Sequence, residues 1–259
     1  MARGIFWFAG LILVIYLLFT AILFVFQRSL IYLPQPRAAS EAAALRLPND
    51  AGELMVTLRP HDGPNALIYF GGNAEDVSLN LPDFAESFPD HALYLMHYRG
   101  FAGSDGSPGE IAIRQDALSL FDAIAGDHRC VLVMGRSLGS AIATHVAAQR
   151  EVSRLILITP FNSLEELAAR QFPFIPVHWL LRDRYHTWRD APGVAAPTLL
   201  VAAENDRIVP RQSTEALLGR FSDGLASLAV IPDRGHNTLH MSDAYAEVLA
   251  RARCPEEED

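Results

Sequence analysis

Residues Cys130 to Arg150 read CVLVMGRSLGSAIATHVAAQR, and this stretch decides the fold. It opens on five apolar residues, Cys130 to Met134, a run typical of a strand buried on both faces of a parallel sheet. From Ala141 onward the stretch is rich in alanine, which favours a helix. Between the two lies Gly135-Arg136-Ser137-Leu138-Gly139, which has the G-x-S-x-G spacing of a tight strand-to-helix turn. The spacing predicts a buried strand, a turn that carries Ser137, and a helix over Leu138 to Gln149.

The G-x-S-x-G spacing has a steric reason. In so tight a turn the strand and the helix pass close to each other, so the residues two before and two after the serine, Gly135 and Gly139, must be small. The turn also places Ser137 at a helix N-terminus, where the dipole and the free N–H groups favour the negative charge of an acyl-transfer intermediate. Ser137 is therefore a candidate nucleophile, and a glycine turn with a surface serine is the alternative interpretation.

Composition and charge limit the classes of protein to consider. The chain has 259 residues, half of them hydrophobic, and a formal net charge of -9 at pH 7, which suits one large α/β domain with an anchor. The acidic balance argues against nucleic acid as a partner. The two cysteines are Cys130, in the predicted strand, and Cys254, before the acidic end Glu256–Asp259; they do not indicate a disulfide framework. We expect the Cys130 thiol to behave as a small core hydrophobe.

The N-terminal residues Ile5 to Phe26 read IFWFAGLILVIYLLFTAILFVF, an uncharged apolar run of about 22 residues. As a helix it would span about 33 Å, enough to cross a bilayer core. A cleaved signal peptide usually has a shorter apolar core followed by a small-residue cleavage site, whereas Gln27 and Arg28 follow here. We therefore predict a single-pass transmembrane anchor that places the protein at the membrane.

Basic residues flank this segment on both sides, with Arg3 before it and Arg28 and Arg37 after it, and so favour neither orientation. The side of the membrane that the domain faces stays open. Candidate interface aromatics are Trp7, Tyr16 and Tyr32.

Residues 27–48 are predicted to form a proline-punctuated tether, and residues 49–254 one domain. Residues 53–59 alternate apolar and polar side chains like an early antiparallel strand. Short apolar runs then alternate with helix-length stretches, which implies a mostly parallel sheet covered by helices on both faces. The expected strands are 66–70, 92–96, 131–134, 155–158, 198–202 and 225–231, and the expected helices are 76–87, 110–125, 138–149, 163–171, 211–221 and 238–253.

Residues 172–188, FPFIPVHWLLRDRYHTW, break this cycle because they are aromatic and interrupted by proline. The segment is too short for an independent domain. We expect a small cap over the site, with ordinary core packing as the alternative.

A serine hydroxyl is a poor nucleophile unless a base, normally histidine, is held beside it by an acid. Asp206 follows the strand 198–202 and His236 follows the strand 225–231. The carboxyl ends of parallel strands meet at one edge of the sheet, so these side chains are expected to lie near Ser137. Ser137, Asp206 and His236 are therefore the predicted catalytic residues, with Glu204 and Asp233 as competing candidates for the acid.

Acyl transfer also needs N–H donors for the developing oxyanion. The backbone N–H of Leu138, directly after the serine, is the first candidate. The second should come from the loop Gly71-Gly72-Asn73-Ala74 after the strand 66–70, and we assign it to the backbone N–H of Asn73. A plain glycine turn is the alternative for this loop.

With these residues assembled, the chain resembles the α/β-hydrolase superfamily, and within it the membrane-anchored α/β-hydrolase-domain proteins, which overlap with the serine aminopeptidase-like group. The likeness covers roughly Leu54 to Leu249 and includes Tyr98 to Pro108, YRGFAGSDGSP, similar to that group's Y-R-G-x-x-x-S-x-G-x-P loop. Two positions depart from the family pattern. Gly71 replaces the usual histidine of H-G-N-A, and Ala203 replaces the usual glycine three residues before the acid.

The resemblance implies the α/β-hydrolase fold and a serine hydrolase that cleaves carboxylic esters or thioesters through an acyl-enzyme on Ser137. The substrate would be a small-molecule or lipid-like acyl compound, and neither a metal nor an organic cofactor is required. One alternative is a serine peptidase of the aminopeptidase type, which needs a carboxylate for the substrate's amino group; Asp183 is a candidate. The other is a non-enzymatic binding protein on a hydrolase scaffold.

Overall fold

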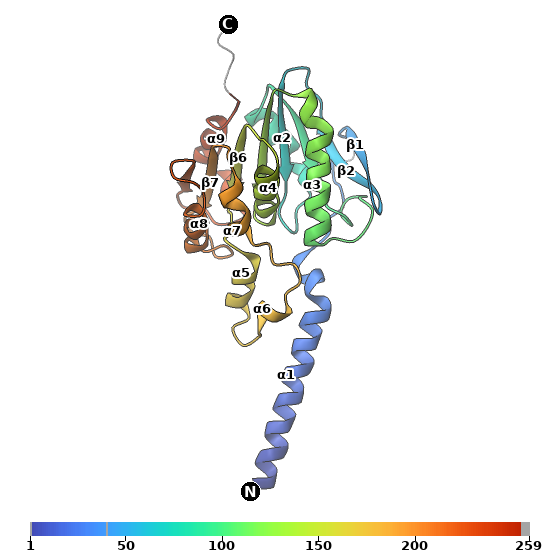
Figure 1. Ribbon diagram of the computed structural model, residues 1–259, viewed down its shortest axis with the longest axis vertical. Coiled ribbons are helices and arrows are strands. Elements are labelled where there is room, and N and C mark those ends of the chain that lie inside the picture. Colours follow the sequence, from blue (N-terminus) through green and yellow to red (C-terminus); the bar gives the residue numbers. More distant parts are fainter. Residues whose placement is uncertain (1, 40, 255–259) are drawn as a thin grey trace.

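The structure, a computed structural model, describes residues 2–39 and 41–254 and is built on an eight-stranded sheet (Figure 1). The strand order is β1-β2-β4-β3-β5-β6-β7-β8; β2 runs antiparallel to both of its neighbours, and the strands from β4 to β8 are parallel. This confirms the α/β-hydrolase fold class. The strands are β1 (Ala44–Asn49), β2 (Gly52–Arg59), β3 (Asn65–Phe70), β4 (His91–Met96), β5 (Cys130–Arg136), β6 (Arg154–Ile158), β7 (Thr198–Ala203) and β8 (Ala226–Ile231).

Helices cover both faces of the sheet. The α-helices are α1 (Ala2–Ile31), α2 (Leu81–Ser87), α3 (Glu110–Ile124), α4 (Leu138–Gln149), α5 (Leu164–Gln171), α6 (Val177–Leu180), α7 (Thr187–Asp190), α8 (Arg211–Leu218) and α9 (Asp243–Ala250). Single 3₁₀ turns complete them: η1 (Val77–Asn80), η2 (Ala125–Asp127), η3 (Ala191–Gly193) and η4 (Leu239–Met241). All six predicted helices contain an observed one, but the last of them is broken into η4 and α9.

The core divides into two layers because successive strand residues point to opposite faces. In β3, Ala66, Ile68 and Phe70 pack with α3 and α4, whereas Leu67 and Tyr69 pack with α2 and α9. Burial on both faces explains why the inner strands are continuous apolar runs rather than alternating ones.

The N-terminal helix extends five residues beyond the expected end of the apolar run, to Ile31. Among the described residues, it is the one helix that is long and apolar enough to cross a membrane, over Ile5–Ile31. It projects from the domain, and its C-terminal end meets the edge of the sheet where the parallel strands end (Figure 1). Two details differ from expectation. Tyr32 is buried in the domain core rather than placed at a membrane interface, and part of the expected tether forms β1.

A disulfide joins Cys130 to Cys254, contrary to the expectation that Cys130 is a free core thiol. Cys130 opens β5, and the chain after α9 returns to this end of the strand, which brings the two Cα atoms within 6.2 Å. The bridge closes a sequence separation of 124 residues and so fastens the C-terminal segment to the central strand. The acidic end Glu256–Asp259 lies outside the described residues.

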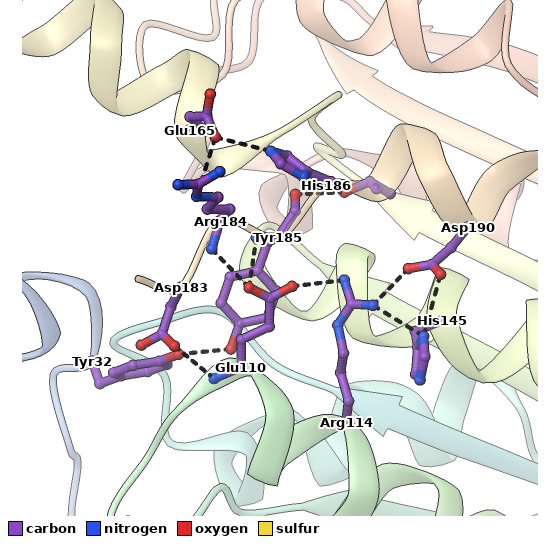
Figure 2. A network of polar contacts seen from close by, with 11 residues as sticks. Tyr32, Glu110, Arg114, His145, Glu165, Asp183, Arg184, Tyr185, His186 and Asp190 are labelled. Carbon is purple, nitrogen blue, oxygen red and sulfur yellow. Dashed lines mark hydrogen bonds and ion pairs between the residues drawn. The ribbon is translucent and has the colours of Figure 1, made fainter. Parts of the chain in front are cut away.

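A polar network attaches the predicted cap to the domain (Figure 2). The Glu110 carboxylate, at the start of α3, accepts hydrogen bonds from the backbone N–H groups of Arg184 and Tyr185 at 2.7 and 3.0 Å. The buried hydroxyl of Tyr185 bonds to that of Tyr32 at 2.8 Å. Arg114 joins Glu110 to Asp190 in α7. The base of the cap, residues 183–190, is therefore fixed to the first turns of α3 and to the segment that follows α1.

Candidate active site

Ser137 lies in the turn between β5 and α4, in a backbone conformation that is rare for a residue with a side chain, with φ of 50° and ψ of -114°. The glycines on either side make the turn possible. A Cβ at Gly139 would overlap the backbone carbonyl of Phe70, and a Cβ at Gly135 would overlap the carbonyl of Gly139. Strand, turn and helix therefore meet at van der Waals distance around the serine, as the sequence predicts.

The three predicted catalytic residues lie in hydrogen-bonding contact. His236 Nε2 is 3.1 Å from Ser137 Oγ, and His236 Nδ1 is 2.8 Å from Asp206 Oδ2. An ionised carboxylate only accepts hydrogen bonds, so Asp206 fixes the proton on Nδ1 and leaves Nε2 free to accept the serine proton. This is the arrangement in which an imidazole acts as a general base toward a hydroxyl.

Backbone donors fix the orientation of the Asp206 carboxylate. Its Oδ1 accepts hydrogen bonds from the N–H groups of Ile208 and Val209, both at 2.8 Å, so Oδ2 faces the imidazole. The competing acid Glu204 is turned elsewhere and accepts the backbone N–H of Asp233 at 2.9 Å. The geometry thus favours Asp206 over both alternatives.

The loop after β3 reaches Ser137 from the other side. A Cβ added to Gly72 would lie 3.9 Å from the Cβ of Ser137, so the loop Gly71-Gly72-Asn73-Ala74 borders Ser137. Leu138 begins α4, which places its N–H at the helix N-terminus beside the serine. The Asn73 side chain donates to the carbonyl of Ile31 at 2.9 Å, and the backbone carbonyl of Asn73 accepts the Leu33 N–H at 3.0 Å. The assignment of the Asn73 N–H to the oxyanion stays a prediction.

An ion pair that the sequence analysis did not single out joins the loops around the serine. Arg136, the residue between Gly135 and Ser137, donates to the Glu75 carboxylate at 2.7 Å and to Asn237 Oδ1 at 2.7 Å. Glu75 accepts the backbone N–H of Gly72 at 2.7 Å. This ion pair thus connects three segments: the tight turn Gly135–Gly139 that carries Ser137, called the elbow below, the loop after β3, and the loop that carries His236. The sequence contains one indication of this ion pair, the charged residue Arg136 inside the G-x-S-x-G motif.

The Glu75 carboxylate is held in its charged form. Burial by itself would raise the pKa of Glu75, but the Arg136 guanidinium and the hydrogen bonds from Tyr69 and Gly72 outweigh it, so the pKa lies below the usual value. Tyr98, from the YRGFAGSDGSP loop, supports the same region by donating its hydroxyl to the carbonyl of Gly71 at 2.6 Å. These residues position the catalytic loops.

Comparison with known proteins shows the family. An uncharacterised protein of Mycobacterium tuberculosis is 33% identical over 235 residues, covering 84% of this chain and 83% of that protein. Protein bem46 of Schizosaccharomyces pombe is 26% identical over 76% of this chain and 70% of its own length. Lysophosphatidylserine lipase ABHD12 of Macaca fascicularis is 30% identical over 56% of this chain and 42% of its own. No protein-family model matches the sequence.

Comparison with solved structures identifies the fold. The α/β hydrolase MGS-M2, from a deep-sea metagenome, superimposes with a TM-score of 0.66 at 14% identity, over 83% of this chain and all of that one. The chain belongs to the α/β-hydrolase superfamily.

In this α/β hydrolase, a cavity of about 860 Å³ is lined in part by His236. Its wall is mixed: the polar side chains of Glu75, Arg136 and Asn237 line it together with apolar ones such as Leu79, Phe84 and Leu239.

Asp183, the candidate carboxylate for a substrate's amino group, is already occupied. It is buried, accepts a hydrogen bond from Arg28 Nε at 2.8 Å and accepts the backbone N–H of Glu110. Within residues 2–39 and 41–254, no group of three histidine, cysteine, aspartate or glutamate side chains is placed to hold a metal ion.

Proposed function

We propose that this α/β hydrolase is a membrane-anchored serine esterase that cleaves the acyl ester or thioester of a lipid-like substrate. The observation that carries the proposal is the pair of contacts made by His236, with Ser137 Oγ on one side and Asp206 on the other. In this mechanism Ser137 Oγ attacks the acyl carbonyl while His236 Nε2 accepts its proton. The N–H groups of Leu138 and Asn73 stabilise the oxyanion.

The second half of the cycle uses the same groups. Protonated His236 gives its proton to the departing alcohol or thiol, and the acyl group stays on Ser137 as an ester. Water then attacks this ester with His236 again as the base, which releases the acid and restores the serine hydroxyl. Asp206 stabilises the imidazolium in both steps without taking its proton.

Two features support an amphiphilic substrate. The helix over Ile5–Ile31 would hold the domain at a membrane, where lipid esters are concentrated. The histidine delivers a proton to the departing group in acyl transfer, and the cavity beside His236 carries charged side chains on part of its wall, among them Glu75 and Arg136, which suits a hydrophilic leaving group. The relative named lysophosphatidylserine lipase has a substrate of this type, an acyl chain joined to a polar headgroup.

The aminopeptidase alternative has less support, because Asp183 is neutralised by Arg28 and removed from solvent. A purely binding role would not need the hydrogen bonds that connect Asp206, His236 and Ser137.

The test is hydrolysis of nitrophenyl esters, thioesters and aminoacyl anilides by the full chain in detergent, with Ser137→Ala and the exposed-site control Ser222→Ala. We expect the wild type and the Ser222 variant to hydrolyse esters or thioesters, and Ser137→Ala to be inactive. Hydrolysis of anilides alone would favour the peptidase, and ester hydrolysis that survives in Ser137→Ala would contradict the proposed nucleophile.

A further inference from the structure

The anchor helix α1 and the apolar part of the cap, residues 172–181, run alongside each other. Tyr16 donates its hydroxyl to the carbonyl of Phe174 at 2.8 Å, near the tip of the cap. Further along α1, Gln27 donates to the carbonyl of Leu180 at 3.2 Å and accepts the Arg182 N–H at 2.7 Å. These contacts align the two segments over more than two turns of α1 (Figure 1).

The contacts also give the depth of the cap relative to the anchor. Eleven residues separate Tyr16 from Gln27, the first polar residue after the apolar run, which is about 16 Å along the helix axis. Half of a bilayer's hydrocarbon core is about 15 Å. If Gln27 lies at the membrane surface, the tip of the cap at Phe174 therefore lies close to the middle of the bilayer.

The side chains of the cap fit that environment. Phe174 and Trp179 are 87% and 77% exposed, which is unusual for such large apolar side chains unless another apolar surface covers them. The segment lies between the charged residues Arg170 and Arg182, and the Arg182 guanidinium lies 4.4 Å from the centre of the Phe24 ring. This cation stands at the level of α1 where its apolar run ends, as expected at a membrane–water boundary.

An apolar groove lies between the two segments. It is lined on one side by Leu23, Phe24 and Ile31 of α1 and on the other by Ile175, Val177 and Leu180 of the cap. Gln27 also lines the groove, but its side-chain amide is hydrogen-bonded to the backbone of Leu180 and Arg182, and the other lining residues are apolar. From Leu23 to Ile31 the groove runs about 12 Å along α1, the length of roughly ten carbons of an extended chain.

The end of the groove at Ile31 lies beside the loop after β3. The carbonyl of Ile31 accepts the side-chain N–H of Asn73, which belongs to the loop that borders Ser137. An acyl chain lying in the groove would therefore have its carbonyl end near Ser137 and its methyl end in the bilayer. The cavity beside His236, whose wall is charged in part, would then lie toward the headgroup.

We propose that residues 172–181 of the cap are embedded in one leaflet beside α1, and that the groove between them takes the acyl chain of a membrane lipid, which enters laterally from the bilayer. This assignment rests on the proposed esterase function and adds to it where the acyl chain binds and how it arrives.

The depth of the cap can be measured without any activity. Both native cysteines are in the disulfide, so Phe174→Cys carries a unique free thiol for a nitroxide label. In phosphatidylcholine vesicles, the label should collide with oxygen and be protected from a water-soluble nickel complex. The control is Ile208→Cys, an exposed apolar position on the loop after β7, which should show the reverse. Equal nickel accessibility at both positions would overturn the insertion.

The groove is tested by filling it. Ile175→Trp places a larger side chain in the groove, and Ile111→Trp does the same at an exposed position on α3. We expect the ratio of kcat/KM for the tetradecanoyl ester to kcat/KM for the butyryl ester to fall by at least about tenfold in Ile175→Trp. The ratio should not change in Ile111→Trp. A ratio that is the same in both variants and the wild type would overturn the groove assignment.

The two proposals fail in different ways. A wild type that cleaves both esters, combined with an unchanged ratio in Ile175→Trp, removes the groove and keeps the esterase. A wild type that cleaves neither ester nor a thioester contradicts the esterase, and with it the role of the groove in catalysis.

Discussion

Asp206→Asn is a specific test of the proposed acid, because the structure fixes which atom of the new amide would face His236. The carboxylate oxygen Oδ1 is held by two backbone N–H donors, those of Ile208 and Val209. In the variant the amide oxygen must take this place, because the amide nitrogen cannot accept a hydrogen bond. The NH₂ group then faces His236 Nδ1 and forces the imidazole to carry its proton on Nε2, where it can no longer accept the proton of Ser137.

The expected loss follows from this change of tautomer. Without a base the serine is not activated, and we expect kcat to fall about 10³- to 10⁴-fold, or about 4 to 5.5 kcal/mol of transition-state stabilisation. Stability should change little, because both backbone donors keep their acceptor. Asp206→Ala leaves those donors without a partner and should cost about 1–3 kcal/mol of unfolding free energy in addition.

The assay is ester hydrolysis at saturating substrate, with urea unfolding of the same preparations. Glu204→Gln is the matched control, because Glu204 was the competing acid and contacts Asp233 rather than His236. It should leave kcat unchanged. A fall of less than about tenfold in Asp206→Asn, or a large fall in Glu204→Gln, would refute the assignment of the acid.

Three further predictions concern stability and the elbow. Reduction of the Cys130–Cys254 disulfide, which closes a separation of 124 residues, should lower the unfolding free energy by about 5 kcal/mol, measured by urea unfolding with and without reductant. Burial lowers the pKa of His97 to about 4, whereas an unfolded histidine titrates near 6.5. The unfolded chain therefore binds the proton first, and stability should fall by up to about 3 kcal/mol as the pH drops from about 6.5 to about 4, a loss that His97→Gln should remove. Gly139→Ala should cost about 1–3 kcal/mol and most of the esterase activity, because the new methyl group would overlap the Phe70 carbonyl; full activity would contradict the tight elbow.

The parts of the fold that could be predicted from the sequence are those with a local physical signature. The inner strands are apolar runs bounded by turns, and α4 begins at Leu138 as expected because the glycine spacing fixes the turn. The closeness of Asp206 and His236 to Ser137 could be predicted because strand ends of a parallel sheet gather at one edge, and their catalytic roles stay predictions. The strand β1 was missed because its sequence, ALRLPN, contains a proline and belongs to an edge strand.

The remaining features depend on which elements become neighbours. The disulfide needs the return of the chain after α9 to the start of β5, and the Glu75–Arg136 pair joins residues 61 positions apart. Tyr16 contacts Phe174 across 158 positions. Neither the composition of the chain nor its hydrophobic periodicity predicts such contacts between distant residues. Tyr32 shows the same limit, since it resembles an interface aromatic in sequence and is placed in the core by its bond to Tyr185.

The central claim is that Ser137 is activated by His236, and the most direct measurement is the reaction of the detergent-solubilised chain with a fluorophosphonate, followed by peptide mass spectrometry. We expect one phosphonyl adduct on Ser137 in the wild type, none in Ser137→Ala and much slower labelling in His236→Ala. A folded wild type that carries no adduct, or carries it on another residue, would contradict the claim.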